Sequence, residues 1–281
     1  MKVRAIRALC AWLLVAGCAA GASDNRGTGA SPGASAGPGS ASATPPAATV
    51  RVAAAADLRF AMDALVAEWD VAEPGTAVEP TYGSSGNFFA QISEGAPFDV
   101  LFSADAEYPR ALEKAGLAAS GSTRLYAIGQ IVVWVPLGSP LDVESDGLQV
   151  LSDPSVRTVA IANPEHAPYG RAAVAAMRAA GVYEAVEPRL VLGENVSQAA
   201  QFVESGNAEA GVIALSLALA SPLVDEGRYA LVPIDSYPPL EQGAVVLDAA
   251  VDPDAAHAFV DFVLGPRGRA VLDSYGFMPP P

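Results

Sequence analysis

The stretch VRVAAAADLRFAMDALVAEW, residues 50–69, decides the fold. Its first residues form a short apolar run, which is typical of a buried β-strand. From Leu58 to Trp69 the large apolar residues return every three or four positions, the spacing of a helix that buries one face. A buried strand followed directly by such a helix is the repeating unit of an α/β protein.

The same pattern of strand and helix recurs along the rest of the chain. We predict further strands at residues 77–81, 98–102, 131–135, 158–162, 190–192, 210–214, 230–234 and 244–247. We predict further helices at residues 87–94, 106–115, 171–180, 198–204, 255–263 and 268–275. The alternation indicates an α/β protein with mostly parallel sheets.

The first seventeen residues have the features of a secretory signal. Lys2, Arg4 and Arg7 precede an apolar run at residues 8–16, which is too short to span a bilayer as a helix. Residues 15–18, Val-Ala-Gly-Cys, resemble a bacterial lipobox, so we predict signal cleavage and acylation at Cys18. An ordinary signal peptide with an incidental cysteine is the alternative.

Residues 18–49 consist almost entirely of Gly, Ala, Ser, Pro and Thr after the cysteine. Such a segment buries too little apolar surface to offset the entropy of ordering it, so we predict a flexible tether between membrane and folded part. Because Cys10 lies in the signal, the mature chain keeps one cysteine and no internal disulfide. We therefore expect an extracytoplasmic protein that is anchored to the cell membrane only through its lipid.

The acidic balance of the chain limits its partners. Removal of Lys2, Arg4 and Arg7 with the signal leaves 13 basic side chains against 31 acidic ones, a net charge of −18. This balance argues against nucleic acid as a partner. It also gives no long-range attraction for an anion, so any anion site must rely on local donors.

Four turns between a strand and a helix carry residues suited to holding an anion: 56–57, 83–86, 167–170 and 194–197. The first amides of a helix have no partner within the helix, and its dipole favours negative charge there. Each turn also has a plainer explanation. Ser85 and Asp57 are common helix-capping types, residues 168–170 suit an ordinary turn, and Val196 suits a core.

The strings around these turns resemble the periplasmic molybdate-binding proteins over residues 50–281. They are VAAAADL at 52–58, SSGN at 84–87, GAPFDVLFSAD at 95–105, NPEHAPYG at 163–170, GPRG at 265–268 and YGF at 275–277. The resemblance implies a type 2 periplasmic-binding-protein fold, with two α/β lobes and a ligand cleft between them. Lobe 1 would comprise residues 50–129 and 240–281, and lobe 2 residues 130–239, with crossings near 128–131 and 235–242.

The resemblance also implies how the ligand is held. Molybdate would be bound by neutral donors: the hydroxyl and amide of Ser85, the backbone amides of Tyr169 and Val196, and the turn at Asp57, with Ala56 and Ser84 as further candidates. No cofactor and no free metal cation are implied. The expected partners of this monomeric protein are the permease and ATPase of an ABC importer.

Other functions remain open at this stage. Tungstate is nearly isosteric with molybdate, and phosphate or sulfate are alternative tetrahedral oxyanions. A lipoprotein without a small ligand is a further alternative. Hydrolase activity is the least expected, because the sequence has no Gly-x-Ser-x-Gly elbow, P-loop or metal-ligand cluster. We therefore expect a binding protein and not an enzyme.

The chain departs from the family at two positions. Ala56 and Asp57 stand where a serine is usual, and Ala214 stands where a tyrosine is often found. Since a carboxylate repels a dianion, we expect the Asp57 side chain to turn away and cap its helix. The alternative is that Asp57 accepts a hydrogen bond from a protonated anion such as hydrogen phosphate. We expect Arg171 to be a solvated surface residue and His166 to be structural.

Overall fold

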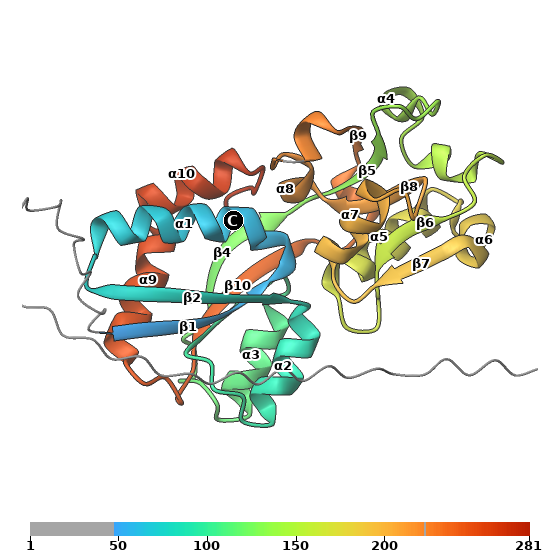
Figure 1. The fold of residues 1–281 in the computed structure, drawn as a ribbon. Coiled ribbons are helices and arrows are strands. Elements are labelled where there is room, and N and C mark those ends of the chain that lie inside the picture. Colours follow the sequence, from blue (N-terminus) through green and yellow to red (C-terminus); the bar gives the residue numbers. More distant parts are fainter. Residues whose placement is uncertain (1–47, 222) are drawn as a thin grey trace, which may run out of the picture. The chain divides into compact units, whose positions relative to one another are not determined.

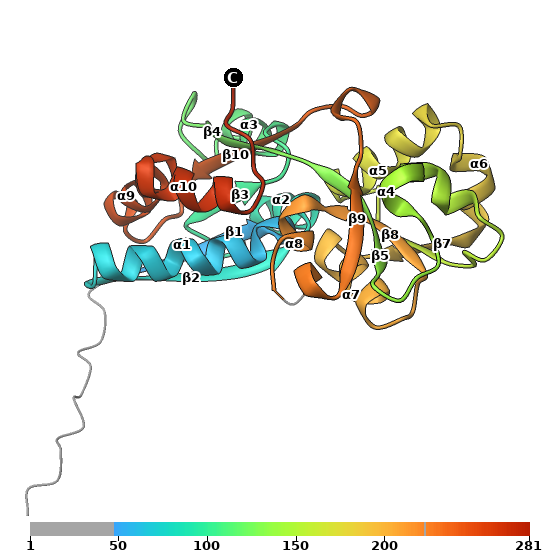
Figure 2. The same ribbon diagram turned by 90° about the horizontal axis from the view of Figure 1, so that it is seen from above.

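The computed structural model describes residues 48–221 and 223–281, which form two mixed sheets with flanking helices (Figures 1 and 2). The predicted signal, Cys18 and nearly all of the predicted tether lie outside the described residues. The first strand, β1, begins at Ala48, two residues before the expected start at Val50. Among the described residues, no helix is both long enough and apolar enough to cross a membrane.

The first lobe is built on a five-stranded sheet with the order β2-β1-β3-β10-β4. Its strands are β1 (Ala48–Ala55), β2 (Thr76–Gly83), β3 (Val100–Ser103), β4 (Arg124–Gly129) and β10 (Leu240–Val246). Its helices are the 3-10 turn η1 (Ala56–Leu58), α1 (Arg59–Ala72), α2 (Ser85–Ser93), α3 (Glu107–Lys114), α9 (Pro253–Leu264) and α10 (Pro266–Ser274).

The second lobe is built on a five-stranded sheet with the order β7-β6-β8-β5-β9. Its strands are β5 (Ile131–Pro136), β6 (Val159–Ala162), β7 (Leu190–Gly193), β8 (Ala210–Ala214) and β9 (Gly227–Leu231). Its helices are α4 (Val143–Asp146), α5 (Pro168–Ala179), α6 (Tyr183–Val186), α7 (Val196–Glu204) and α8 (Leu215–Ala218). The chain passes between the sheets at Gln130 and again between Leu231 and Leu240.

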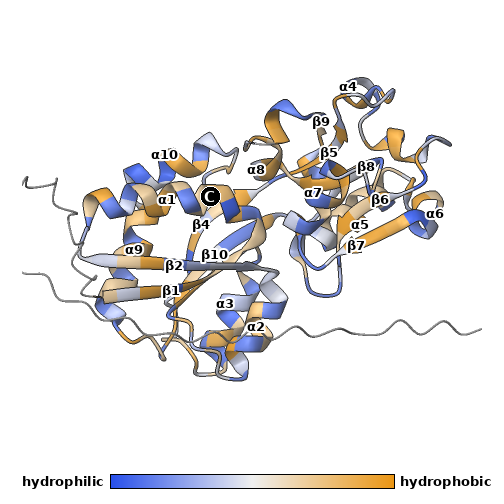
Figure 3. Cartoon of the chain, in the orientation of Figure 1, coloured by the Kyte–Doolittle hydropathy of each residue, from blue (hydrophilic) through white to orange (hydrophobic). Residues whose placement is uncertain are grey.

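The side chains of β1 alternate between two apolar layers of the first lobe. Val50, Val52 and Ala54 pack with α1, α9 and α10, whereas Ala53 packs with α2 and α3 on the other face. Trp69 closes the first layer through edge contacts with Phe259 and Phe262, each with ring centroids 5.4 Å apart. In Figure 3 the exposed faces of these helices are hydrophilic and their inner faces apolar, as the spacing from Leu58 to Trp69 predicts.

Both sheets are mixed, so the expectation of mostly parallel sheets holds for only some of the strand pairs. β1 runs parallel to β2 and β3, and β6 runs parallel to β7 and β8. However, β10 is antiparallel to both of its neighbours, and so is β5. β5 follows the first crossing between the lobes, and β10 follows the second. In each sheet, the strand that enters from the other lobe therefore runs antiparallel to its neighbours.

The helices that begin at the cleft start earlier than the apolar spacing suggests. α2, α5 and α7 were expected to begin at residues 87, 171 and 198, and they begin at Ser85, Pro168 and Val196. The first turn of each helix is marked by a capping residue or a proline rather than by large apolar residues. The earlier starts put Ser85, Tyr169 and Val196 inside first helical turns.

Candidate anion-binding site

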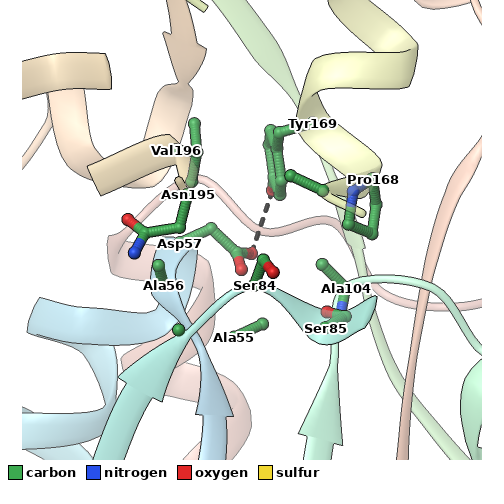
Figure 4. A pocket seen from close by; sticks show the side chains of 12 residues that line it. Ala55, Ala56, Asp57, Ser84, Ser85, Ala104, Pro168, Tyr169, Asn195 and Val196 are labelled. Carbon is green, nitrogen blue, oxygen red and sulfur yellow. Dashed lines mark hydrogen bonds between the residues drawn. The ribbon is translucent and has the colours of Figure 1, made fainter. Parts of the chain in front are cut away.

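The four predicted turns meet at one small pocket (Figure 4). Ten of its twelve lining residues come from them: Ala56, Asp57, Gly83, Ser84, Ser85, Ala167, Pro168, Tyr169, Asn195 and Val196. The pocket is a small cavity of about 10 Å³, far below the space that a sugar or an amino acid needs. The two lobes pack together as one compact part of the chain, and residues of both lobes line the pocket.

Two adjacent serines at the start of α2 make different contacts. Ser84 is the N-cap, and its hydroxyl oxygen accepts from the amide of Asn87 at 3.3 Å. Ser85 follows as the first helical residue, and its hydroxyl oxygen accepts from the amide of Ala104 at 2.9 Å. That contact leaves the hydroxyl hydrogen of Ser85 able to donate. Ser85 is 1% exposed and lines the pocket, so it is placed as a donor and not as the cap.

The starts of α5 and α7 bring backbone amides to the opposite wall. Tyr169 is the second residue of α5, after Pro168, and no side chain caps this helix. Val196 is the first residue of α7, where Asn195 caps by accepting from the amide of Gln198 at 3.0 Å. The first amides of both helices have no acceptor within the helix, and both dipoles favour an anion.

The Asp57 side chain does not cap a helix, contrary to expectation. Neither η1 nor α1 has a side-chain cap, and the Asp57 carboxyl lies in the pocket lining at 1% exposure (Figure 4). Its Oδ2 atom accepts from the Tyr169 hydroxyl at 3.0 Å and from Nε2 of Gln242 at 2.6 Å. These two neutral donors, which reach Oδ2 from α5 and β10, hold the carboxyl inside the cleft.

The environment of Asp57 changes its acidity. Burial raises the pKa of this carboxyl to about 6, although the hydrogen bonds from Gln242 and Tyr169 act in the opposite direction. Burial and the neighbouring Asp57 charge raise the pKa values of the Tyr126 and Tyr169 hydroxyls well above the usual range. Near pH 6 the Asp57 carboxyl is therefore half-ionised, while the Tyr169 hydroxyl beside it and the Tyr126 hydroxyl behind Gln242 are neutral.

Sequence reasoning missed Gln242 and Tyr126. Gln242 is 0% exposed, and its Oε1 atom accepts from the Tyr126 hydroxyl at 2.6 Å while Nε2 reaches Asp57. A polar residue inside the apolar strand β10 was an available signal, because buried polar groups usually have a specific partner. The partner itself lies 185 residues away, so the sequence could not identify it.

Several contacts join the two lobes beside the pocket. The Ser84 hydroxyl lies 2.9 Å from Nδ1 of His166, and the amide of Gly86 donates to the His166 carbonyl at 3.0 Å. A Cβ atom at Gly86 would lie 2.5 Å from that carbonyl oxygen, so only glycine allows this approach. Asn87 donates to Glu194 at 3.2 Å. His166 therefore has a structural place at the cleft.

Arg171 is partly solvent-exposed, as expected, with 40% of its side chain accessible, and it also reaches across the cleft. One of its terminal nitrogens lies 2.6 Å from Oδ2 of Asp105, and the other donates to the Tyr108 hydroxyl at 3.2 Å. This cation is thus already paired with lobe 1. Within residues 48–221 and 223–281, no group of three or more His, Cys, Asp or Glu residues is placed to hold a metal cation.

Of the two pocket serines, Ser84 lies beside a histidine and Ser85 does not. The oxygen of Ser85 contacts the Ala104 amide, and His166 instead contacts Ser84, whose oxygen caps α2. The Ser84 oxygen is engaged at the start of α2, where it accepts from the Asn87 amide.

Comparison with known proteins agrees with this arrangement. Residues 50–278 match the family described as bacterial extracellular solute-binding protein. The molybdate-binding protein ModA of Azotobacter vinelandii is 39% identical over 231 residues, which cover 82% of this chain and 90% of that protein. ModA of Rhodobacter capsulatus is 39% identical over 204 residues, covering 73% and 78%.

A solved structure shows the same relationship in three dimensions. The periplasmic molybdate-binding protein of Azotobacter vinelandii matches with a TM-score of 0.77 and 32% identity, covering 83% of this chain and 100% of that one. The two α/β lobes are therefore those of a periplasmic binding protein. The chain belongs to the bacterial extracellular solute-binding protein family, as a homologue of the molybdate-binding proteins ModA.

Proposed function

We propose that this protein captures molybdate outside the cytoplasm and delivers it to the permease and ATPase of an ABC importer. The observation that carries the proposal is the convergence of four helix or 3-10 starts on one small pocket between the lobes. The relatives named above, with their printed function of molybdate binding, support the choice of anion.

The anion would be held by neutral donors. Ser85 would donate its hydroxyl hydrogen from lobe 1, while the first amides of α5 and α7, at Tyr169 and Val196, would donate from lobe 2. Because donors come from both lobes, a bound anion would hold the lobes together. The acidic chain has no long-range attraction for its ligand, so recognition would depend on these short-range contacts.

Size is the expected basis of selectivity. Tungstate is nearly isosteric with molybdate, and we propose that it binds equally well. Sulfate and phosphate are smaller and would leave one or more donors at a longer distance, at a cost that depends on how far the lobes can adjust.

Phosphate is the second candidate because Asp57 lies in the pocket. An ionised Asp57 could accept the proton of hydrogen phosphate, whereas it would repel the proton-free molybdate dianion. The two candidates therefore predict opposite orders of affinity.

Calorimetric titration of the ligand-free protein with four anions separates them. At about pH 7, molybdate and tungstate should bind with micromolar or better affinity. Sulfate and phosphate should bind at least about tenfold more weakly, a gap of roughly 1.4 kcal/mol. Tighter binding of phosphate than of molybdate would contradict the proposal.

We also propose a lipid anchor at Cys18 and a monomeric state. The support for the anchor is the lipobox-like sequence at residues 15–18 and the tether composition that follows it. Replacing Cys18 by Ala should move the protein from the membrane fraction to the soluble extracytoplasmic fraction. Continued membrane association of that variant would contradict the anchor.

A further inference from the structure

The two oxygens of the Asp57 carboxyl have different surroundings. Oδ2 accepts two hydrogen bonds, from Tyr169 and Gln242. Oδ1 is buried and has no hydrogen-bond partner among the described residues. A buried polar atom without a partner is costly, and it suggests that a ligand supplies one. Since Asp57 lines the pocket, that partner would be the bound anion (Figure 4).

No nearby cation balances an Asp57 charge. Its neighbours on other elements are polar but uncharged: the Tyr169 hydroxyl on α5, the Gln242 amide on β10, and the Ser216 hydroxyl on α8, which donates to the Asp57 carbonyl at 2.7 Å. In the part of the chain that the structure describes, no Lys or Arg side chain forms an ion pair with Asp57. The other titratable groups near this cluster are Tyr126, Tyr237 and His166.

An ionised Asp57 would thus place a third negative charge beside a dianion in a pocket lined by buried residues. A neutral carboxylic acid would remove that repulsion. It would also use both oxygens: Oδ2 as the carbonyl oxygen that accepts from Tyr169 and Gln242, and Oδ1 as a hydroxyl that donates.

We propose that Asp57 enters the complex as a neutral acid whose Oδ1–H donates to an oxygen of the bound dianion, so that capture of the anion takes up one proton. The inference rests on the proposed function and adds a specificity determinant to that site. A proton donor at this position favours an anion without a proton of its own, such as molybdate, over hydrogen phosphate.

The pKa of Asp57 in the free protein is consistent with the uptake of a proton when the anion binds. Burial has already raised its pKa to about 6 in the free protein. A bound dianion raises it further, so the proton is taken up between the free and the bound pKa values. Above about pH 6, affinity should therefore fall as pH rises, by up to about tenfold per pH unit. Below that pH, Asp57 is protonated in both states and this dependence should vanish.

Calorimetry with sodium molybdate in two buffers of different ionisation enthalpy measures the proton directly. At about pH 8 the wild-type chain should take up close to one proton per anion, and its affinity should fall by up to about tenfold from pH 7 to pH 8. Asp57→Asn keeps an acceptor for Tyr169 and Gln242 and puts an N–H donor in place of the acid. It should bind without proton uptake, with an affinity that changes less than about twofold over the same range.

Two further variants identify the proton-binding group. His166→Gln removes the imidazole that lies beside the pocket, and proton uptake should persist in this variant. Glu165→Gln is a matched acid-to-amide change at an exposed position on the loop before α5, and it too should retain the uptake. Uptake that persists in Asp57→Asn, or that is lost in His166→Gln, would overturn the inference.

The remaining outcomes separate this inference from the proposed function. Wild-type binding of molybdate without proton uptake would overturn the inference alone. Tighter binding of phosphate than of molybdate, without proton uptake, would show that Asp57 stays ionised and accepts the ligand's proton. That result would overturn both the inference and the proposed function. Absence of binding for all four anions would also overturn both.

Discussion

Asp57 and Asp99 are each 1% exposed, but they lie in opposite chemical surroundings. Asp99 precedes β3 and accepts from the Arg51 amide at 2.7 Å, from Arg51 Nε at 2.9 Å and from the Val251 amide at 2.9 Å. The Arg51 guanidinium also forms an ion pair with it at 2.8 Å. The side chains that donate to the Asp57 carboxyl belong to Tyr169 and Gln242, which carry no charge.

The two carboxyls therefore differ in acidity. Burial acts to raise the pKa of Asp99, but the hydrogen bonds and charge of Arg51 and the amide of Val251 outweigh it, and the pKa is lowered. At Asp57 burial prevails, and the pKa rises to about 6. Asp99 therefore carries a charge that joins three segments of lobe 1, whereas Asp57 is a carboxyl at the cleft whose charge changes near pH 6.

The largest effect should come from removing the paired charge. Asp99→Asn should destabilise the fold by about 3–4 kcal/mol, because it leaves Arg51 without its counter-charge in a partly buried place. Urea unfolding at about pH 7 measures this. Glu107→Gln, which breaks the exposed pair with Arg110, is the matched control and should cost less than about 1 kcal/mol. Equal losses of unfolding free energy in Asp99→Asn and Glu107→Gln would contradict the special role of the Asp99 charge.

Replacing Asp57, the carboxyl without an ion-pair partner, should instead raise the unfolding free energy relative to wild type as the pH rises. In wild type the folded pKa of Asp57, about 6, exceeds the unfolded value of 3.8, so stability is lost as pH rises through this window. Asp57→Asn removes that loss. Its unfolding free energy minus that of wild type should therefore grow by about 2–3 kcal/mol between about pH 4 and pH 7.5. A difference that stays constant across these pH values would mean that Asp57 is ionised at little cost.

A smaller effect is expected for the hydroxyl that faces the same pocket. Ser85→Ala should weaken molybdate binding by about 2 kcal/mol, because a desolvated anion loses one donor. Ser93→Ala, at the far end of the same helix, is the matched control and should leave affinity unchanged. An unchanged affinity in a folded Ser85→Ala variant would exclude Ser85 from the site.

The smallest effect should come from Tyr169→Phe. This change keeps the backbone amide at the start of α5 and removes only the hydroxyl that donates to Asp57 Oδ2. Since that hydrogen bond lowers the pKa of Asp57, its loss should raise the pKa and favour the neutral acid. Molybdate affinity at about pH 7 should change by less than about 1 kcal/mol. A loss as large as that of Ser85→Ala would mean that the phenol itself binds the anion.

Local patterns predicted much of this fold. The apolar runs and the three-to-four spacing predicted most strands and helices, and the turn residues predicted which helix starts meet at the pocket. The directions of β5 and β10 were not predictable in this way, because a strand's pairing depends on where the chain returns from the other lobe. β4 is a further strand that the apolar pattern does not predict, and only its last two residues fall within the predicted crossing near 128–131.

The limits of sequence reasoning at the site have similar causes. A shift of one residue decides whether Ser84 or Ser85 caps α2, and apolar spacing does not resolve one residue. The orientation of Asp57 depends on Gln242 and Tyr169, which are distant in the chain. With only neighbouring residues in view, capping was the more favourable prediction for this carboxylate.

Anomalous diffraction at the molybdenum absorption edge, from crystals grown with molybdate, tests the central claim most directly. One strong peak should lie in the pocket, with the anion's oxygens about 2.7–3.2 Å from the Ser85 hydroxyl, the amides of Tyr169 and Val196, and Oδ1 of Asp57. A peak elsewhere on the molecule, or an Asp57 side chain turned out of the pocket when the anion is bound, would contradict it.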